Sequence, residues 1–191
     1  MAVQTQWHYA VDELPPIMSA EEFRAINPEF SATDEQISAV LDSVSAAIRA
    51  HCGWHVSPVL DCTYTGRGNG RLLMLPAMGV RDVLALTVCG ESVGDYRWDD
   101  DGMVELTAGQ FPRGFRTVEC SYAAGIESAE LAQIVAQIAS NALVAAPGVS
   151  AESAGNVSIS YNKTGDGITG GVSLLARDRE QLAPYKLHRA W

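Results

Sequence analysis

The sequence predicts an α+β fold, in which two core helices flank an inserted antiparallel β block and an extended C-terminal tail follows. Apolar residues recur at helical spacing in segments 34–52 and 128–145. Between them, at about 56–123, lie short strand-like runs separated by turn residues. These runs are too closely spaced to hold crossover helices, so their strands should pair antiparallel.

The size and charge of the chain limit its function. It has 191 residues, of which 47% are hydrophobic, enough to bury a sizeable core. Its formal net charge of −10 argues against broad binding to nucleic-acid phosphates or to an anionic membrane surface, because both need clustered Lys and Arg. No apolar run is long enough to span a bilayer, and residues 1–16 lack the basic start and apolar core of a secretory signal. We therefore expect the chain to act in the compartment where it is made.

The charge is unevenly distributed along the chain. Residues 1–50 hold eight acids and two bases, whereas residues 151–191 hold four acids and five bases. An acidic front and a mildly basic tail suit head-to-tail contact between copies. On charge alone, chance composition is the simpler explanation.

The first segments are an extended arm and a short helix. Residues 1–18 should form an extended N-terminal arm, because Pro15 and Pro16 disfavour a helix there. Ser19 and Glu22 form a capping-box pattern, which predicts a short helix from residue 20 to about residue 27.

The first core helix has clear start and stop signals. Thr33 and Gln36 form a second capping box, and Gly53 is the expected terminator. We expect its buried stripe to include Ile37, Leu41, Val44 and Ile48.

Five or six strands should make up the β block. The expected strands are residues 59–65, 71–75, 80–89, 95–98, 103–107 and 115–122. The first two should pair around the glycine-rich turn at 66–70. Asp101 and Gly102 should supply the positive φ values for a tight hairpin between the strands at 95–98 and 103–107.

The second core helix completes a domain at residues 19–147, which carries the β insertion. Its buried residues should be Leu131, Ile134, Val135 and Ile138. Residues 147–148, Pro-Gly, should end the helix. The C-terminal tail, residues 148–191, should contain a polar loop at 148–156, a strand at 156–161, a flexible glycine-rich stretch and one or two helical turns at 177–182.

One cluster of His and Cys residues resembles a metal site at first inspection. His51, Cys52 and His55 lie at the end of a helix, and Cys62 lies in the next strand. Their spacing matches no standard zinc motif, because no second CxxC or HxxxH pair exists. We therefore expect no zinc on these residues.

No other motif predicts catalysis or a cofactor. Residues 165–170 have the letters GxGxxG, but the following segment is too short and too β-like to be the helix that binds a pyrophosphate. The acids at 99–101 lack the alternate spacing of an EF-hand loop. No nucleophile elbow is present, and the chain has only four histidines. We expect neither an enzyme nor a cofactor, and assign no catalytic, cofactor-binding or metal-binding residue.

Several segments occur in an order known from one protein family. The helix at 34–52 ends in CGWH at 52–55 and leads into a strand. The segments that follow it are 75–83 (LPAMGVRDV), the hairpin region at 88–106, 118–125 (VECSYAAG) and 172–185. This order, over residues 18–187, resembles the head–tail connector (head completion adaptor) proteins of tailed bacteriophages, and the last segment resembles the tail end of adaptors from phages of actinobacteria.

The resemblance implies a structural virion protein. Such adaptors form a ring, commonly of twelve copies, beneath the portal protein at the capsid vertex. The ring extends the DNA channel without binding DNA specifically, and offers a docking platform to the stopper and the tail. The chain would lie at the head–tail interface of the virion, and in the host cytoplasm during assembly. A neighbouring tail-completion protein, or a small enzyme or metal-binding module on the β block, remains an alternative.

The apolar tail is the expected partner-binding segment. Residues 148–191 are too few for a separate core, so they either fold back on their own domain or bind a neighbour. The resemblance points to the portal or an adjacent subunit, so we expect residues 172–191 to be mobile in the monomer and ordered in the assembly. The expected contact residues are Arg177, Arg179, Leu182, Tyr185, Lys186, Arg189 and Trp191.

Overall fold

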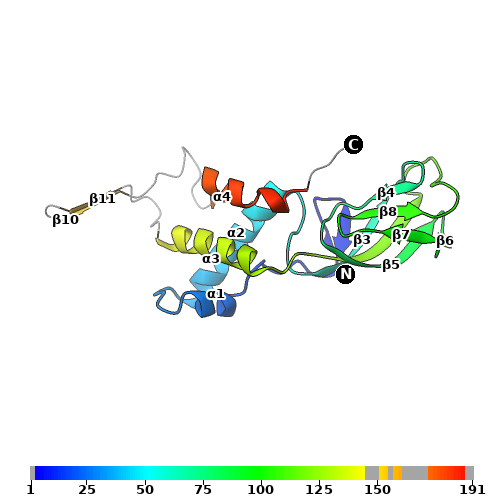
Figure 1. Ribbon diagram of the computed structural model, residues 1–191. Coiled ribbons are helices and arrows are strands. Elements are labelled where there is room, and N and C mark those ends of the chain that lie inside the picture. Colours follow the sequence, from blue (N-terminus) through cyan, green and yellow to red (C-terminus); the bar gives the residue numbers. More distant parts are fainter. Residues whose placement is uncertain (1–2, 145–150, 155–156, 161–171, 188–191) are drawn as a thin grey trace. The chain divides into compact units, whose positions relative to one another are not determined.

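The computed structural model describes residues 3–144, 151–154, 157–160 and 172–187. The chain combines helices with antiparallel sheets (Figure 1), as predicted. It divides into two compact units. The β unit consists of Met1–Pro15, Cys52–Glu127 and Pro184–Trp191, and the helical unit of Pro16–His51 and Ser128–Ala183. None of the described helices is long and apolar enough to cross a membrane.

Two antiparallel sheets form the β unit. The larger sheet has the order β1 (Val3–Gln4), β2 (Tyr9–Val11), β3 (Leu60–Gly66), β9 (Val118–Ala124), β5 (Val80–Val88) and β6 (Glu91–Ser92). The smaller sheet has the order β4 (Leu72–Met74), β8 (Met103–Leu106) and β7 (Tyr96–Trp98). Alternate residues of β9 are buried, so one face of this central strand faces the core.

The N-terminal arm is extended, and it belongs to the larger sheet. Tyr9 of β2 lies opposite Tyr64 of β3. Trp7, Tyr9 and Val11 are buried. The apolar residues of the arm are therefore part of the core of the β unit.

One expected hairpin is wrong and another is confirmed. Strand β3 pairs with β2 and β9, whereas β4 pairs with β8. The seven-residue ladder between β3 and β9 offers far more pairing than the three-residue strand β4 could. The hairpin of β7 and β8 forms as predicted, and Gly102 has a φ of 87°. Asp101 does not share this positive φ.

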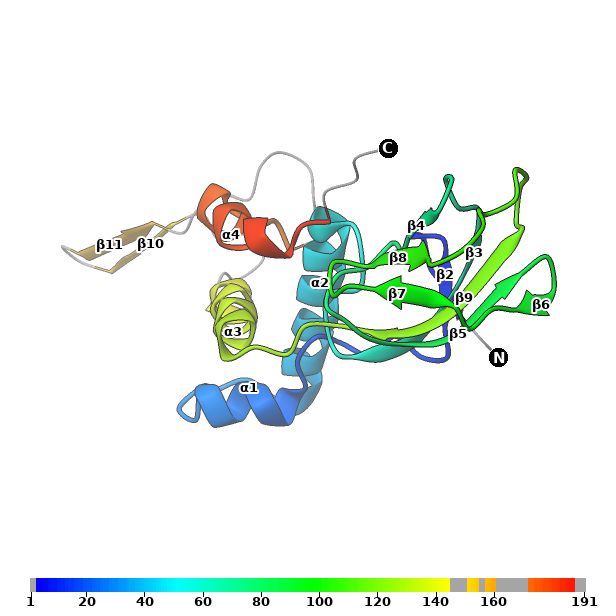
Figure 2. The same ribbon diagram turned by 45° about the vertical axis from the view of Figure 1, so that its right-hand side comes forward.

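The helical unit contains α1 (Ala20–Ile26), α2 (Asp34–Cys52) apart from its last residue, α3 (Ala129–Val144) and α4 (Ala176–Gln181). Helix α3 contacts both α1 and α4, and Figure 2 shows α3 beside α2. A short antiparallel pair, β10 (Ala151–Ala154) and β11 (Val157–Ser160), lies where a loop and a strand were predicted. A 3₁₀ turn at Ala183–Tyr185 follows α4.

The predicted helical core is confirmed. The residues expected in it are all at most 6% exposed, and they are Ile37, Leu41, Val44, Ile48, Leu131, Ile134, Val135 and Ile138. Both predicted capping boxes form, one between Ser19 and Glu22 and one between Thr33 and Gln36. Gly53 follows α2 with a φ of 81°, as expected of a helix terminator.

The C-terminal segment differs from the expectation of a detached tail. Leu182 is fully buried and Tyr185 is 7% exposed. The indole N–H of Trp54 donates to the Tyr185 carbonyl oxygen at 2.7 Å, and the Leu187 N–H donates to the Cys52 carbonyl oxygen at 2.9 Å. Residues 172–187 therefore fold back on their own chain, because apolar side chains of this segment are buried there. The expected glycine-rich stretch at 165–171 lies outside the described residues.

Candidate functional site

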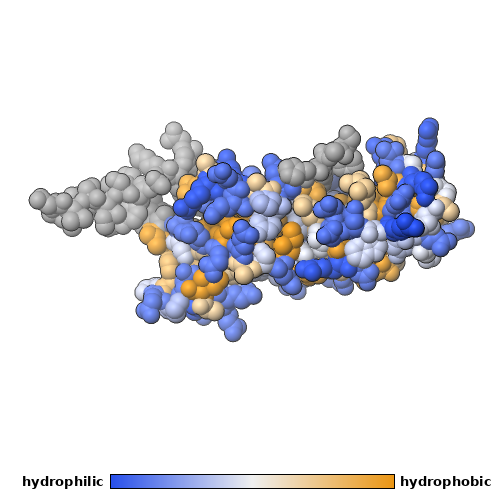
Figure 3. Space-filling model, in the orientation of Figure 1, coloured by the Kyte–Doolittle hydropathy of each residue, from blue (hydrophilic) through white to orange (hydrophobic). Residues whose placement is uncertain are grey.

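A hollow of about 690 Å³ opens on the helical unit. Its lining comes from residues 29–32 of the α1–α2 loop, from Gln36, Ala39 and Val40 of α2, and from residues 142–144 of α3. We call it the α2–α3 groove. Most of these side chains are apolar, and Val144 is 58% exposed. Apolar surface is also visible over the helices in Figure 3.

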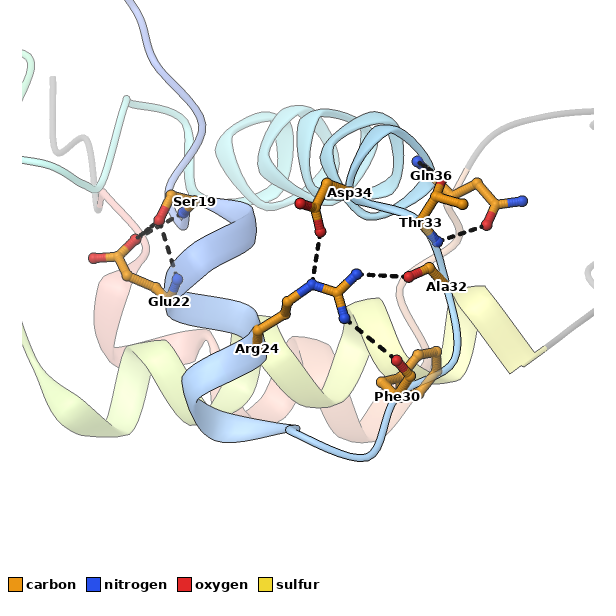
Figure 4. A network of polar contacts seen from close by, with 8 residues as sticks. All are labelled: Ser19, Glu22, Arg24, Phe30, Ala32, Thr33, Asp34 and Gln36. Carbon is orange, nitrogen blue, oxygen red and sulfur yellow. Dashed lines mark hydrogen bonds and ion pairs between the residues drawn. The ribbon is translucent and has the colours of Figure 1, made fainter.

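Arg24 of α1 fixes the loop that forms one wall of the groove (Figure 4). Its Nε lies 2.6 Å from Asp34 Oδ1, at the start of α2. Its Nη2 donates to the Ala32 carbonyl oxygen at 2.7 Å and its Nη1 to the Phe30 carbonyl oxygen at 3.4 Å. One guanidinium thus satisfies two loop carbonyls and joins the loop to both flanking helices.

The same loop is anchored by its own side chains. The Phe30 ring meets the buried Phe23 ring edge to face, with centroids 5.6 Å apart. Thr33 and Gln36 bond to each other's backbone N–H groups, which fixes the first turn of α2. The groove wall is therefore held in place before any partner arrives.

The groove has an acidic rim. Glu29 lines the groove and is exposed. Glu35 is exposed and lies one helical turn before Ala39, so the two residues share one side of α2. Among the described residues neither glutamate forms an ion pair, whereas Asp34 is paired with Arg24.

Two neighbouring loops of the β unit carry the opposite charge. The loop at 66–71 lies against the loop at 107–117, since the Phe111 N–H donates to the Gly70 carbonyl oxygen at 2.7 Å. Neither loop contains Asp or Glu, and together they hold Arg67, Arg71, Arg113 and Arg116. Arg71 pairs with Glu105 at 3.8 Å. The other three arginines form no ion pair within the described part of the chain.

Phe115 projects from this basic surface. Its side chain is 87% exposed, more than that of any other large apolar residue described. The Arg67 guanidinium lies 5.8 Å from its ring centroid, within cation–π range. We call Phe115, Arg67, Arg113 and Arg116 the Phe115 knob.

Some of the partner-binding residues predicted in the tail are exposed and others are buried. Arg177, Arg179 and Lys186 are exposed, as a contact surface requires. Leu182 and Tyr185 are buried within the chain, so their apolar side chains are not free for a partner. Arg189 and Trp191 lie outside the described residues.

The His and Cys residues near the end of α2 have structural surroundings. His55 is fully buried, and its Nε2 donates to the Ala124 carbonyl oxygen at 2.9 Å. Its Nδ1 then accepts from the Tyr9 hydroxyl at 2.7 Å, so both ring nitrogens are engaged. Burial raises the pKa of the Cys52 and Cys62 thiols to about 12, which disfavours the thiolate that zinc requires. We therefore keep the prediction that these residues, with His51, bind no zinc.

The sequence analysis did not single out the groove or the knob. It assigned Phe115 to a strand, but β9 begins three residues later, at Val118. The pattern Arg-Gly-Phe-Arg at 113–116 was an available signal, because an aromatic residue between arginines beside a glycine suits an exposed loop. The groove had no such signal, since its wall at 142–144 is distant in the sequence from the walls at 29–40.

No family model and no curated protein sequence matches the chain. Its fold is similar to that of chains in three solved structures of gene transfer agent (GTA) particles. A chain from the neck of the empty particle, computed with C6 symmetry, is 18% identical with a TM-score of 0.60, and the match covers 100% of this chain and 97% of that chain. A chain from the virion of the native particle is 17% identical with a TM-score of 0.61, over 96% and 97%. A chain from the neck of the native particle, computed with C12 symmetry, is 16% identical with a TM-score of 0.56, over 100% and 97%. This chain therefore shares their fold over nearly its whole length.

Proposed function

We propose that the chain is a structural protein of the neck of a phage-like virion. In this role it is a head–tail connector adaptor, which forms a ring beneath the portal, extends the DNA channel and provides the docking platform for the stopper and the tail. The observation that carries the proposal is the fold similarity, which spans at least 96% of this chain and 97% of the chains from GTA necks and virions.

A closed ring is the expected assembly of such a protein. Two of the similar structures are necks computed with C6 and C12 symmetry. This supports a homo-oligomeric ring, for which we propose twelve copies. Cyclic rings arise when one surface of a subunit binds a different surface of the next, and the groove and the knob supply two unlike surfaces.

The charge of the chain suits a DNA channel. A formal net charge of −10 repels the DNA phosphates, so DNA can pass through the lumen without being held. We place the assembled protein at the head–tail interface of the virion, and the free subunit in the host cytoplasm.

The described His and Cys residues are compatible with a structural role. In the described part of the chain, no group of three or more His, Cys, Asp or Glu residues could hold a metal ion. The buried His55 uses both ring nitrogens to join separate segments of the β unit. The hydrogen bonds of His55 therefore give this residue a structural role.

Deletion of the gene in a particle-producing cell tests this function. We expect DNA-filled heads without tails, and restoration of tailed particles when the protein is supplied from a plasmid. The chain should purify with portal-bearing heads from a tail-deficient strain. A tail-completion protein would purify with free tails instead. Normal tailed particles in the deletion strain would contradict the proposal.

A further inference from the structure

We propose that copies of this chain bind head to tail, with the Phe115 knob of one copy seated in the α2–α3 groove of the next. This inference rests on the proposed ring and names the surfaces that would build it. It assigns a binding partner, a second copy of the chain, to both surfaces.

The first argument is the apolar fit. Phe115 is 87% exposed, so the described residues of its own chain leave its ring largely uncovered. Removal of an exposed aromatic ring from water by a partner lowers the free energy of the complex. The groove is lined mainly by apolar side chains, and its volume of about 690 Å³ exceeds the space that one aromatic side chain needs. A single protruding ring can therefore enter a hollow that the described residues of one chain leave open.

The second argument is charge complementarity. The knob brings Arg67, Arg113 and Arg116, which form no ion pair within the described part of the chain. The groove rim brings Glu29 and Glu35, whose carboxylates are likewise unpaired there. The whole chain has 23 acids and 13 bases, so two loops that hold four arginines and no acid are a local exception. Opposite charges around an apolar contact fix its register and speed its formation.

The third argument is preorganisation. Arg24 and the Phe23–Phe30 contact hold the loop wall of the groove in place. On the knob, Gly114 and Arg116 have φ values of 155° and 55°, and they flank Phe115 in a bend of the chain. Neither surface must fold on binding, which lowers the entropic cost of association.

The contact would be heterologous, because knob and groove are different surfaces. Each copy offers one of each, so successive copies close into a ring if the rotation between them permits. Duplex DNA is the rival occupant of the three arginines. We favour a second copy because the knob is aromatic at its centre and the chain as a whole is strongly acidic.

Sedimentation velocity of the purified full chain, at low ionic strength over a concentration series, tests the contact. We expect wild-type protein to form species larger than dimers. Phe115→Ala removes the knob, and Ala39→Arg fills the groove with a repelling charge; each should weaken association at least tenfold. The matched controls are Leu84→Ala, at a 53% exposed apolar residue elsewhere on the β unit, and Ala46→Arg, at an exposed α2 residue outside the groove. Both controls should associate like wild type.

Mixing the two defective variants makes the test specific. Phe115→Ala keeps its groove and Ala39→Arg keeps its knob, so an equimolar mixture should give dimers and nothing larger. A charge exchange, Glu29→Arg with Arg116→Glu in one chain, should restore part of the association that either change alone removes. Circular dichroism melts check that every variant is folded.

Three results would overturn the contact. The first is a wild-type protein that stays monomeric at the highest concentration, and the second is a Phe115→Ala or Ala39→Arg variant that associates as well as its control. The third is a variant of the knob arginines that loses binding to duplex DNA while its self-association is intact. The proposed function is judged separately, by whether the wild-type chain lies in the neck of particles. Particles with this chain in the neck that assemble normally from Phe115→Ala protein would reject the contact and leave the function standing.

Discussion

The four cysteines differ in ways that solution chemistry can detect. Cys89 is exposed, whereas Cys52, Cys62 and Cys120 are buried. Burial raises the pKa of each buried thiol to about 12, and for Cys52 the nearby Lys186 partly offsets the effect. We predict that iodoacetamide at pH 8 labels Cys89 rapidly and the others only after unfolding. Mass spectrometry of the labelled peptides checks this, and rapid labelling of Cys62 would contradict it.

The same thiols predict how stability depends on pH. Their folded-state pKa lies above the ordinary value of 9.0, so folding favours the protonated form. This contribution is complete below about pH 9 and is lost as the pH rises toward 12, because the unfolded chain releases its protons first. Urea unfolding at pH 7, 9 and 10.5 should show the decline only above pH 9. A Cys62→Ala, Cys120→Ala variant should show a shallower decline.

Single residues were predictable from sequence where their partners are near in the chain. The capping pairs Ser19–Glu22 and Thr33–Gln36 each span three residues, so the spacing alone specifies the bonds. Arg24 bonds to carbonyls six and eight residues away, and no local rule specifies that distance. The exposure of Phe115 was missed because its loop was assigned to a strand.

At the scale of elements, the helical core makes a quantitative prediction. Leu41 is fully buried in the stripe of α2, so Leu41→Ala removes packed methyl groups and leaves a cavity. We predict a loss of about 2–5 kcal/mol in the free energy of unfolding. The exposed Ser38 on the same helix is the control, and Ser38→Ala should change this free energy by less than about 0.5 kcal/mol. Equal effects in urea titrations would show that the stripe is misplaced.

The C-terminal segment makes a second prediction at this scale. Leu182 is fully buried after α4, so Leu182→Ala should lower the free energy of unfolding by about 2–5 kcal/mol. Arg179→Ala, at an exposed residue of α4, should have little effect. Thermal melts followed by circular dichroism measure both. A melting temperature unchanged by Leu182→Ala would mean that the segment is detached in solution, as the sequence alone suggested.

Elements were predictable to the extent that their signals are local. Helix α2 spans residues 34–52 as predicted, because its cap, stripe and terminator all lie within the segment. The partner of β3 was not predictable from the turn that follows it, since β9 is more than fifty residues away in the sequence. Strand pairing depends on the competition among all strands of a sheet. The groove of the helical unit was not predictable either, because it forms only when the helices pack.

At the scale of the whole molecule, sequence order was more informative than any one motif. The short motifs LPA and YAAG are individually common, but their order between two helices indicated the fold that this chain shares with the GTA chains. The acidic composition is compatible with the proposed role, because negative charge suits a channel through which DNA must pass. The proposed knob and groove could not be predicted from the sequence, since they depend on which side chains are exposed in the folded chain.

The central claim is that the chain forms a ring in the neck of a virion. A cryo-electron microscopy reconstruction of the neck, from particles produced by cells that express this chain, tests it most directly. We predict a ring of twelve copies directly beneath the portal, in which both the β unit and the helical unit fit the density and the side chains match this sequence. A neck in which other chains account for every ring, with no density for this one, would contradict the account.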